Sequence, residues 1–367
     1  MQAMRQNLEA SQSGLVDTPW PGCDVPCYLG IVDIPADVSV PEPRTSRNNR
    51  LIEYALLQDE FMQHVGAAVD QYGAHRVGVV MGTSTSSIDR TEEAYREMGE
   101  DERFAAEFLQ PRTHNPHAPG DYLAQRLGLT GPCMTVSAAC ASSAKVFAAA
   151  ERWLQQGLVD AVVVGGADTL CLSVIYGFHS LQLVSDEPCQ PFSPRRKGIS
   201  LGEAAGFALL SNEPAEICLR GVGESCDAHH MSSAHPEGLG AKLSMQRALD
   251  AAGISMEDVD YVNLHGTGTR ANDEIEGKVC AEIASSNTRF SATKGWTGHA
   301  LGAAGIVEAV LSMNAVLTGF VPGTMNTTQA EPGLPVLLDS TCCRIDTVLT
   351  NSFGFGGNNC SVVFSRT

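Results

Sequence analysis

Runs of apolar residues, each bounded by glycine or polar residues, divide the first part of the chain into alternating strands and helices. Residues 76–83 and 160–168 are almost continuously apolar, as is typical of strands in a sheet covered on both faces. Residues 51–69 are apolar with helical periodicity and predict a helix. Two more strands, at 205–210 and 217–222, are predicted to close a first half of the chain. This alternation predicts a layered α/β fold.

The rest of the chain repeats the pattern. The predicted elements are helices at 240–252, 273–283 and 298–316 and strands at 259–264, 290–293, 336–338, 347–350 and 360–364. In both halves a strand stops at a polar, reactive residue and a small-residue helix follows, so halves packed face to face would surround one shared cleft. Because no low-complexity linker separates them, we expect one compact body with an N-terminal half, 1–213, and a C-terminal half, 214–367.

Composition and charge favour some classes of protein and argue against others. The chain has 367 residues, 43% of them hydrophobic, and 36 glycines, which suits an α/β enzyme with many tight turns. Its net charge of −18 argues against nucleic acid or an anionic membrane as a partner. No run of eighteen apolar residues and no signal peptide is visible, so we expect a cytoplasmic protein without a membrane span. The 12 cysteines are dispersed, and their spacing suggests neither disulfides nor a metal site.

One cysteine differs from the others in its position. A β-prone run from Thr135 stops at Cys140, where a helix rich in alanine begins and continues to Leu154. A helix N-terminus favours the thiolate form of cysteine, and strand, sharp turn, nucleophile and helix follow one another in the nucleophile elbow of acyl-transfer enzymes. The alternative is a buried cysteine that only fills space. We expect a nucleophile that is partly ionised by the helix N-terminus.

Three segments of the second half complement this cysteine. His265 ends a strand and precedes a Gly-Thr-Gly-Thr loop, Lys294 and His299 flank a short turn, and residues 351–359 form a glycine-rich loop with two phenylalanines. Singly, each has an ordinary structural explanation: a core histidine, a solvated lysine, a plain turn. Together they supply a thiolate, backbone donors for an oxyanion, and two imidazoles that can stabilise an enolate during decarboxylation. A protease-like Cys/His pair needs only one histidine.

These motifs resemble those of the elongating β-ketoacyl-acyl-carrier-protein synthases, and the likeness runs from about Arg44 to the C-terminus. The matching segments are Ala138-Ala139-Cys140-Ala141-Ser142, residues 265–269 with Asp273, residues 294–299 with Glu308, and Gly354-Phe355-Gly356-Gly357. The resemblance implies a thiolase-like α-β-α-β-α fold built from two similar halves. It also implies a decarboxylative condensation of a cysteine-bound acyl group with malonyl-acyl-carrier protein, in fatty-acid or polyketide chain elongation.

The resemblance implies a role for each matching residue. Cys140 would be acylated, His265 and His299 would serve decarboxylation, and Lys294 would support the histidines, with Glu308 and Asp273 behind them. The N–H groups of Cys140 and Phe355 would form the oxyanion hole. Phe353 and Phe355 would gate the acyl pocket, Thr267 and Thr269 would meet the phosphopantetheine arm, and Arg44, Arg47 and Arg196 would dock the acidic carrier protein. The plainer reading of the arginines near residue 44 is a solvated helix start. Substrates would be carried on phosphopantetheine, with no other cofactor and no metal.

Finer distinctions rest on the same comparison. Two histidines separate the chain from initiating synthases, which carry His and Asn, and the intact Cys140 separates it from inactive chain-length-factor partners. Residues 46–49, 177–181 and 227–231 look closer to synthases of aryl polyene pathways than to housekeeping enzymes, and a homodimer or a heterodimer with a related subunit is implied. The alternatives are a non-catalytic partner subunit and a thiolase, which would need a second cysteine such as Cys360.

Three departures from the family pattern stand out. The family opens with a strand and a Thr-Gly-x-Gly turn, whereas this chain begins in a segment that resembles the following helix. We therefore expect either one sheet strand fewer or a start further upstream. Lys197 stands where an aspartate is usual, and Ala204 replaces a glycine.

Overall fold

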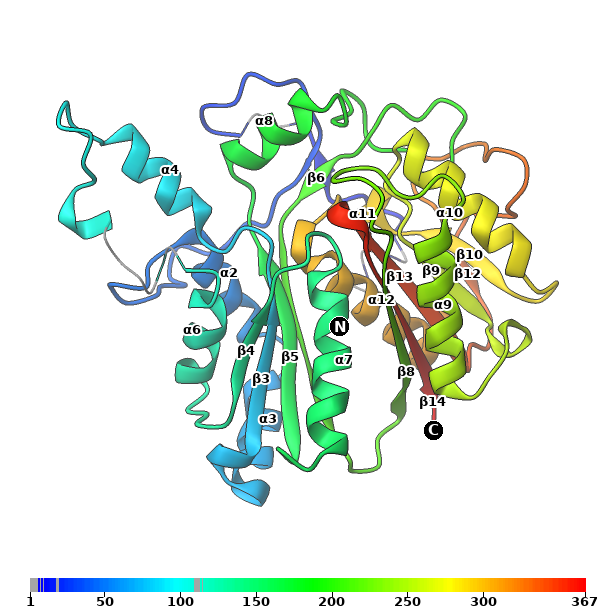
Figure 1. Cartoon of the computed structure of the whole chain (residues 1–367), viewed down its shortest axis with the longest axis horizontal. Helices are drawn as coiled ribbons and strands as arrows, with labels where there is room; N and C mark the ends of the chain where they lie inside the picture. The colour runs from blue at the N-terminus through cyan, green and yellow to red at the C-terminus, as the bar shows by residue number, and fades with distance from the viewer. Residues whose placement is uncertain (1–5, 7, 9, 18–19, 109–112, 114) are drawn as a thin grey trace.

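The computed structural model describes the chain except residues 1–5, 7, 9, 18–19, 109–112 and 114, so most of the helix expected at the very N-terminus lies outside the described residues. Two mixed sheets form its framework (Figure 1). The first contains, in spatial order, β4 (Cys133–Val136), β3 (Val77–Gly82), β5 (Ala161–Asp168) and β7 (Ala204–Ser211). β3 pairs in parallel with β4 and β5, whereas β7 is antiparallel to β5.

The second sheet belongs to the C-terminal part of the chain. Its spatial order is β10 (Arg289–Ala292), β9 (Tyr261–Leu264), β13 (Thr347–Gly354), β14 (Asn358–Arg366) and β8 (Ile217–Cys226). The strand predicted to close the first half is therefore wrongly placed, because β8 pairs with β14 at the edge of the second sheet. Among the described residues the first sheet has four strands and the second five.

Helices occupy three layers around these sheets. α7 (Ser142–Gln155) and α12 (Ala304–Thr318) lie between the sheets. The first sheet is covered on its outer face by α2 (Arg47–Leu56), α3 (Phe61–Tyr72) and α6 (Ala118–Arg126), and the second by α9 (Leu239–Ala252) and α10 (Arg270–Ile283). The predicted α-β-α-β-α layering is confirmed.

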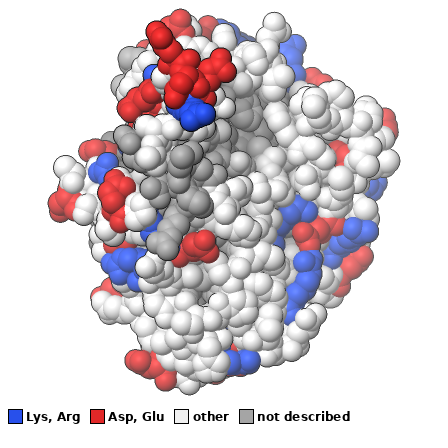
Figure 2. Space-filling view, turned by 60° about the vertical axis from the view of Figure 1, so that its left-hand side comes forward, with Lys and Arg blue, Asp and Glu red and all other residues white. Residues whose placement is uncertain are grey.

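Shorter elements connect the layers. In the part of the chain that the structure describes, they are β1 (Leu15–Val16), β2 (Leu29–Gly30), β6 (Leu201–Gly202), β11 (Phe320–Val321), β12 (Thr341–Cys342), α4 (Ile88–Arg96), α8 (Leu172–Ser180), α11 (Lys294–Thr297) and five single 3₁₀ turns, among them η4 (Leu301–Ala303) and η5 (Phe355–Gly357). In Figure 2, the largest group of acidic side chains lies at the upper left of the face in view, and other acidic side chains lie among the lysines and arginines over the rest of it.

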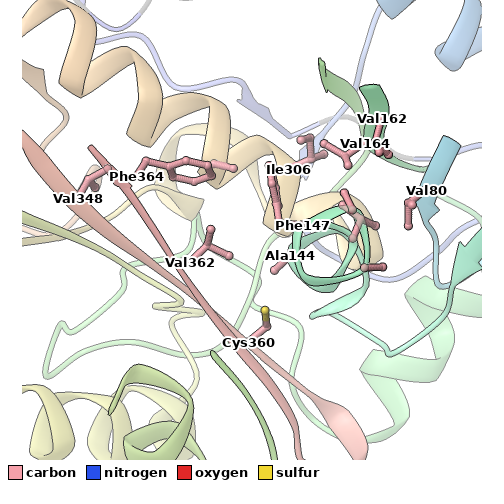
Figure 3. Close-up of a cluster of buried hydrophobic side chains, with 14 of the residues drawn as sticks. Val80, Ala144, Phe147, Val162, Val164, Ile306, Val348, Cys360, Val362 and Phe364 are labelled. Atoms are coloured by element: carbon pink, nitrogen blue, oxygen red, sulfur yellow. The ribbon is translucent and has the colours of Figure 1, made fainter. Parts of the chain in front are cut away.

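The central core lies between the two sheets. Phe147 of α7, Ile306 of α12 and Phe364 of β14 meet there (Figure 3), with the two phenylalanine rings edge to face at 5.3 Å between centroids. A Cβ added at Gly305 would lie 2.5 Å from the backbone nitrogen of Ala144, so the two central helices approach too closely for larger residues. The alanine and glycine content of both helices follows from this approach.

Among the described residues, one segment is long and apolar enough to cross a membrane. Residues 301–318, which include α12, meet that test by length and composition, but 72% of this window is buried inside the protein. Its side chains pack against both sheets and α7. This burial identifies α12 as the core helix of a layered fold.

Two predicted elements differ from the observed ones. The helix predicted at 51–69 is two helices, because the chain turns at Asp59 and Glu60, whose φ values of 52° and 58° interrupt the helix between α2 and α3. The strand predicted at 336–338 is only an isolated bridge from Val336 to Phe290. The break between α2 and α3 carries no proline or glycine, so the apolar periodicity runs through it, whereas Pro332, Gly333 and Pro335 stand immediately before the bridge at Val336.

Candidate active site

The turn after β4 presents Cys140 at the start of α7. Ala139 has φ of 49°, in the left-handed region, and its carbonyl accepts hydrogen bonds from Ser84 Oγ at 2.9 Å and Ser142 Oγ at 2.6 Å. These bonds hold a conformation that a residue with a Cβ rarely adopts. Cys140 is only 6% exposed and lines a cavity of about 220 Å³. The predicted strand, sharp turn, cysteine and helix are all present.

The ionisation predicted for this cysteine is wrong. Burial raises the pKa of the Cys140 thiol to about 11, although the charge of Lys294 and a hydrogen bond from the Phe355 N–H to the sulfur both lower it. Desolvation penalises the thiolate more than the backbone groups and the lysine favour it. The thiol therefore keeps its proton at neutral pH and must release it during the attack on a thioester.

Two neutral imidazoles lie in the same cavity. The rings of His265 and His299 are 5.5 Å apart between centroids and nearly perpendicular, and both residues are 2% exposed. Burial lowers both pKa values well below the usual one, and the positive charge of Lys294 lowers them further. Both rings are therefore uncharged at neutral pH.

Hydrogen bonds assign the same tautomer to both rings. Nδ1 of His265 lies 3.2 Å from Lys294 Nζ, and Nδ1 of His299 accepts the Leu301 N–H at 3.0 Å. The Lys294 ammonium group and the Leu301 N–H can only donate hydrogen bonds. Nδ1 is therefore the acceptor in each ring, and Nε2 carries the proton. Each imidazole keeps one N–H for a ligand.

A buried ion pair stands behind His265. Lys294 and Glu308 are bonded to one another, with side chains 2% and 3% exposed, and Lys294 also donates to the carbonyl oxygen of His265. Ser352 Oγ lies 3.4 Å from Glu308, and burial raises the pKa of this carboxyl while Lys294 lowers it. Neither Lys294 nor Glu308 lines the cavity. The pair acts on the cavity through His265.

Two buried carboxylates shape the loop that follows His265. Glu276 accepts the N–H groups of His265 and Gly266, both at 2.8 Å. Asp273 accepts those of Thr267 at 3.1 Å and Gly268 at 3.3 Å. The loop therefore turns around the first two turns of α10, and Thr267 and Thr269 line the cavity. Burial raises the pKa of Glu276 to about 7.

The glycine-rich loop of residues 351–359, from the C-terminal half, forms the remaining wall of the cavity. A Cβ added at Gly354 would lie 3.1 Å from the backbone nitrogen of Cys140, so this loop rests on the turn that carries the cysteine. The Phe355 N–H bonds the sulfur, while the Phe353 ring lies 5.9 Å from the His265 ring and both phenylalanines line the cavity. Two backbone N–H groups, from Cys140 and Phe355, thus lie together beside the sulfur.

Comparison with known proteins identifies this arrangement. Residues 41–215 match the family model for the N-terminal domain of β-ketoacyl synthases, and residues 217–328 match that for the C-terminal domain. The chain belongs to the β-ketoacyl synthase family. It is therefore a ketosynthase, a condensing enzyme of the acyltransferase class, and its fold is the thiolase-like fold expected from the motifs.

Several relatives cover most of this ketosynthase. The 3-oxoacyl-acyl-carrier-protein synthase 2 of Vibrio cholerae is 33% identical over 331 residues, covering 83% of this chain and 79% of that protein. Nodulation protein E of Rhizobium sp. (strain N33) is 31% identical over 324 residues, covering 84% and 80%. A chain in the solved complex of the ketosynthase ApeO with its chain-length factor ApeC, from Xenorhabdus doucetiae, is 37% identical, with a TM-score of 0.90 and 100% and 94% coverage.

The arginines expected to dock a carrier protein are mostly engaged within the ketosynthase itself. The Arg196 side chain is 1% exposed and pairs with Asp273, Glu274 and Glu331. Arg47 is paired with Glu203. Burial therefore contradicts a docking role for Arg196, and Arg47 is a structural residue at the start of α2. Arg44 lines a different cavity, beside Tyr122 and Arg126, rather than the one that holds Cys140.

Sequence reasoning missed some residues that hold the site. Glu276 had a usable signal, because it lies three residues after Asp273 and so on the same face of one helix. Phe178 of α8, which stacks on Phe355 at 5.5 Å, had none, since the contact joins segments far apart in the chain. Within the described residues no group of three or more His, Cys, Asp or Glu is placed to hold a metal ion.

Proposed function

We propose that this ketosynthase elongates an acyl chain by condensing a Cys140-bound acyl group with malonyl-acyl-carrier protein. The observation that carries the proposal is a single cavity lined by Cys140 from one half and by His265 and His299 from the other. We take the two halves to meet at residues 213 and 214, close to the junction of the two family matches.

The first step is acyl transfer to the cysteine. The thiol of Cys140 attacks the thioester carbonyl, its proton passes to the sulfur of the phosphopantetheine arm as the carbon–sulfur bond breaks, and the oxyanion is held by the N–H groups of Cys140 and Phe355. The phosphopantetheine thiol then departs with the carrier protein.

The second step is decarboxylation and condensation. The thioester carbonyl of malonyl-carrier protein accepts the Nε2–H groups of His265 and His299, which stabilise the enolate oxygen when carbon dioxide leaves. The electron pair of the broken bond forms the enolate, whose carbon attacks the acyl-cysteine carbonyl. The new carbon–carbon bond expels the Cys140 thiolate, which takes a proton from water. Lys294 fixes His265, with Glu308 as its buried counter-ion, and Asp273 shapes the loop that presents Thr267 and Thr269 to the phosphopantetheine arm.

An acidic carrier protein needs cations at the mouth of this cavity. Arg195 and Arg270 are exposed, and Arg270 opens α10 beside the lining residues Thr269 and Ala271. The buried Arg196 guanidinium reaches the carbonyl oxygens of Thr269 and Arg270 at 3.4 and 3.3 Å, which brings the two exposed arginines onto neighbouring segments. We therefore assign docking to these two, with Arg44 as a more distant contact, and steering by their charge would raise the association rate.

The pathway and partner follow from the closer relatives. Identity of 37% to a chain of the ApeO–ApeC complex favours an aryl polyene type of elongation and a heterodimer with a chain-length factor. Two of the matched relatives are 3-oxoacyl-acyl-carrier-protein synthases, which supports a place in the cytoplasm. Substrates would arrive on the phosphopantetheine of acyl-carrier protein.

The alternatives are less well supported. A thiolase would need a second cysteine in the cavity, but Cys360 is fully buried in the central core between the sheets (Figure 3). A non-catalytic partner subunit would have no use for a sulfur that accepts a backbone N–H beside two neutral imidazoles. Both observations favour the catalytic assignment.

Acyl loading tests the assignment of the nucleophile. We expect wild-type protein mixed with acyl-carrier protein bearing a labelled acyl group to gain the acyl mass, and Cys140→Ala to gain none. Cys226→Ser, which changes an exposed cysteine outside the cavity lining, should load like wild type. Intact-mass spectrometry measures both, and full loading of Cys140→Ala would refute the proposal.

A further inference from the structure

A buried carboxylate lies just behind the cavity without lining it. Asp168 ends β5 and is fully buried, and Oδ1 accepts the Thr83 hydroxyl at 2.5 Å and both the N–H and the hydroxyl of Thr85 at 3.0 and 2.8 Å. Oδ2 accepts the N–H groups of Ser84 at 2.8 Å and Gly302 at 2.7 Å. Burial raises the pKa of this carboxyl and the hydrogen bonds from residues 83–85 lower it, and in the described part of the chain no lysine or arginine pairs with it.

These donors join three segments of the fold. Residues 83–85 follow β3, Asp168 ends the neighbouring strand, and Gly302 lies in η4, the turn between His299 and α12. A Cβ added at Gly302 would lie 2.6 Å from both Asp168 Oδ2 and the Ser84 nitrogen. The carboxylate therefore ties η4 to the ends of two strands with no space between them.

The clamped turn sets the hydrogen bond of one histidine. Leu301 has φ of 53°, which a leucine rarely adopts, and in this conformation its N–H donates to Nδ1 of His299 at 3.0 Å. The next N–H, of Gly302, is the one bound by Asp168. Holding that peptide keeps Leu301 in its strained conformation, because a free turn would relax and withdraw the donor from the ring.

We propose that Asp168 is a positioning residue for the condensation step. It holds η4 so that the Leu301 N–H binds Nδ1 of His299 and Nε2–H remains available to the malonyl thioester carbonyl. The inference rests on the proposed function, because it assumes that His299 stabilises the enolate. A competing route exists through Ser84, whose hydroxyl bonds the carbonyl of Ala139 next to the nucleophile. That route would affect loading of Cys140 instead.

Two partial reactions separate these routes. In the full chain, Asp168→Ala is expected to lower the rate of malonyl-acyl-carrier-protein decarboxylation by about 10- to 100-fold, because the His299 imidazole is displaced. Cys140 should still load at close to the wild-type rate. Glu53→Gln is the matched control, because Glu53 is also a buried carboxylate, bonded to Tyr122 and Arg126 away from the cavity. It should leave both rates unchanged. Equal losses in loading and decarboxylation would overturn the proposal.

The tautomer of His299 can be measured separately from stability, because destabilisation alone would not change it. With ¹⁵N-labelled histidine, and His299→Gln to identify the signal, wild type should show Nε2–H alone and Asp168→Ala a mixture of tautomers. An unchanged tautomer would overturn the proposal. If the alanine variant does not fold, Asp168→Asn replaces it. This variant keeps an acceptor for the Gly302 N–H, so we expect a smaller loss, confined to decarboxylation. An equal loss in the rates of loading and decarboxylation would refute the positioning role. A wild-type protein that neither loads nor decarboxylates would instead refute the proposed function.

Discussion

The nucleophile and the histidines meet in one cavity but are held there by different physical means. The turn at Cys140 is fixed by shape: a left-handed Ala139, two hydroxyl bonds to its carbonyl, and a glycine loop pressed against it. His265 is fixed by charge, through the buried pair of Lys294 and Glu308. Changes in volume should therefore damage the first region, and changes in charge the second.

Removing the charge of Lys294 should give the largest loss of stability and of condensation activity. Lys294→Met leaves Glu308 buried without a partner and is expected to cost about 3–5 kcal/mol of unfolding free energy and to lower condensation about 100-fold. The double variant Lys294→Met with Glu308→Leu should regain much of the stability without regaining condensation. Urea unfolding and condensation assays measure the two effects. A single variant as stable as wild type would show that charge does not hold this region.

Adding one methyl group tests the other region. In Gly354→Ala the new Cβ would lie 3.0 Å from the carbonyl oxygen of Ala138 and 3.1 Å from the nitrogen of Cys140. The displaced loop should move the Phe355 N–H and slow acyl loading about 10-fold, less than the loss of a whole oxyanion donor. Gly66→Ala, with nothing within 4 Å of its new Cβ, is the control and should load normally. Loading rates of the two variants decide the point.

The smallest effect concerns pH. Because the folded-state pKa values of His265 and His299 lie well below 6.5, the unfolded chain takes up protons below that pH while the folded chain does not. Stability from these groups is present above pH 6.5 and falls as the pH decreases, by up to about 1.4 kcal/mol per pH unit for each ring. Urea unfolding across this range should show a shallower slope for His265→Gln with His299→Gln. The same slope in both proteins would contradict buried, neutral imidazoles.

The same division explains what the sequence could predict. Strand positions, the elbow at Cys140 and the loops that bring His265 and His299 to it follow from local patterns, and the structure places all three residues in one cavity. The thiol pKa was predicted in the wrong direction, because burial depends on segments far away in the chain. The docking assignment of Arg196 failed for the same reason: its carboxylate partners come from α10 and from residue 331.

The supporting carboxylates show a second limit. Asp168 looks like the last residue of an apolar strand, and only the folded chain reveals the three segments that it joins. Glu276 could have been grouped with Asp273 from helical spacing, but its bonds to His265 and Gly266 depend on the bend of the loop. Local patterns located the groups proposed to react, whereas most of the groups that hold them were found only in three dimensions.

The central claim is that the two regions divide the reaction, the first accepting the acyl group and the second breaking and making carbon–carbon bonds. Its most direct test follows one sample by intact-mass spectrometry, first with acyl-carrier protein and then with malonyl-carrier protein. Wild type should gain the acyl mass and lose it as the elongated product forms on the carrier. His299→Ala should gain the same mass and keep it. Loss of the acyl adduct from His299→Ala at the wild-type rate, with elongated product, would contradict the account.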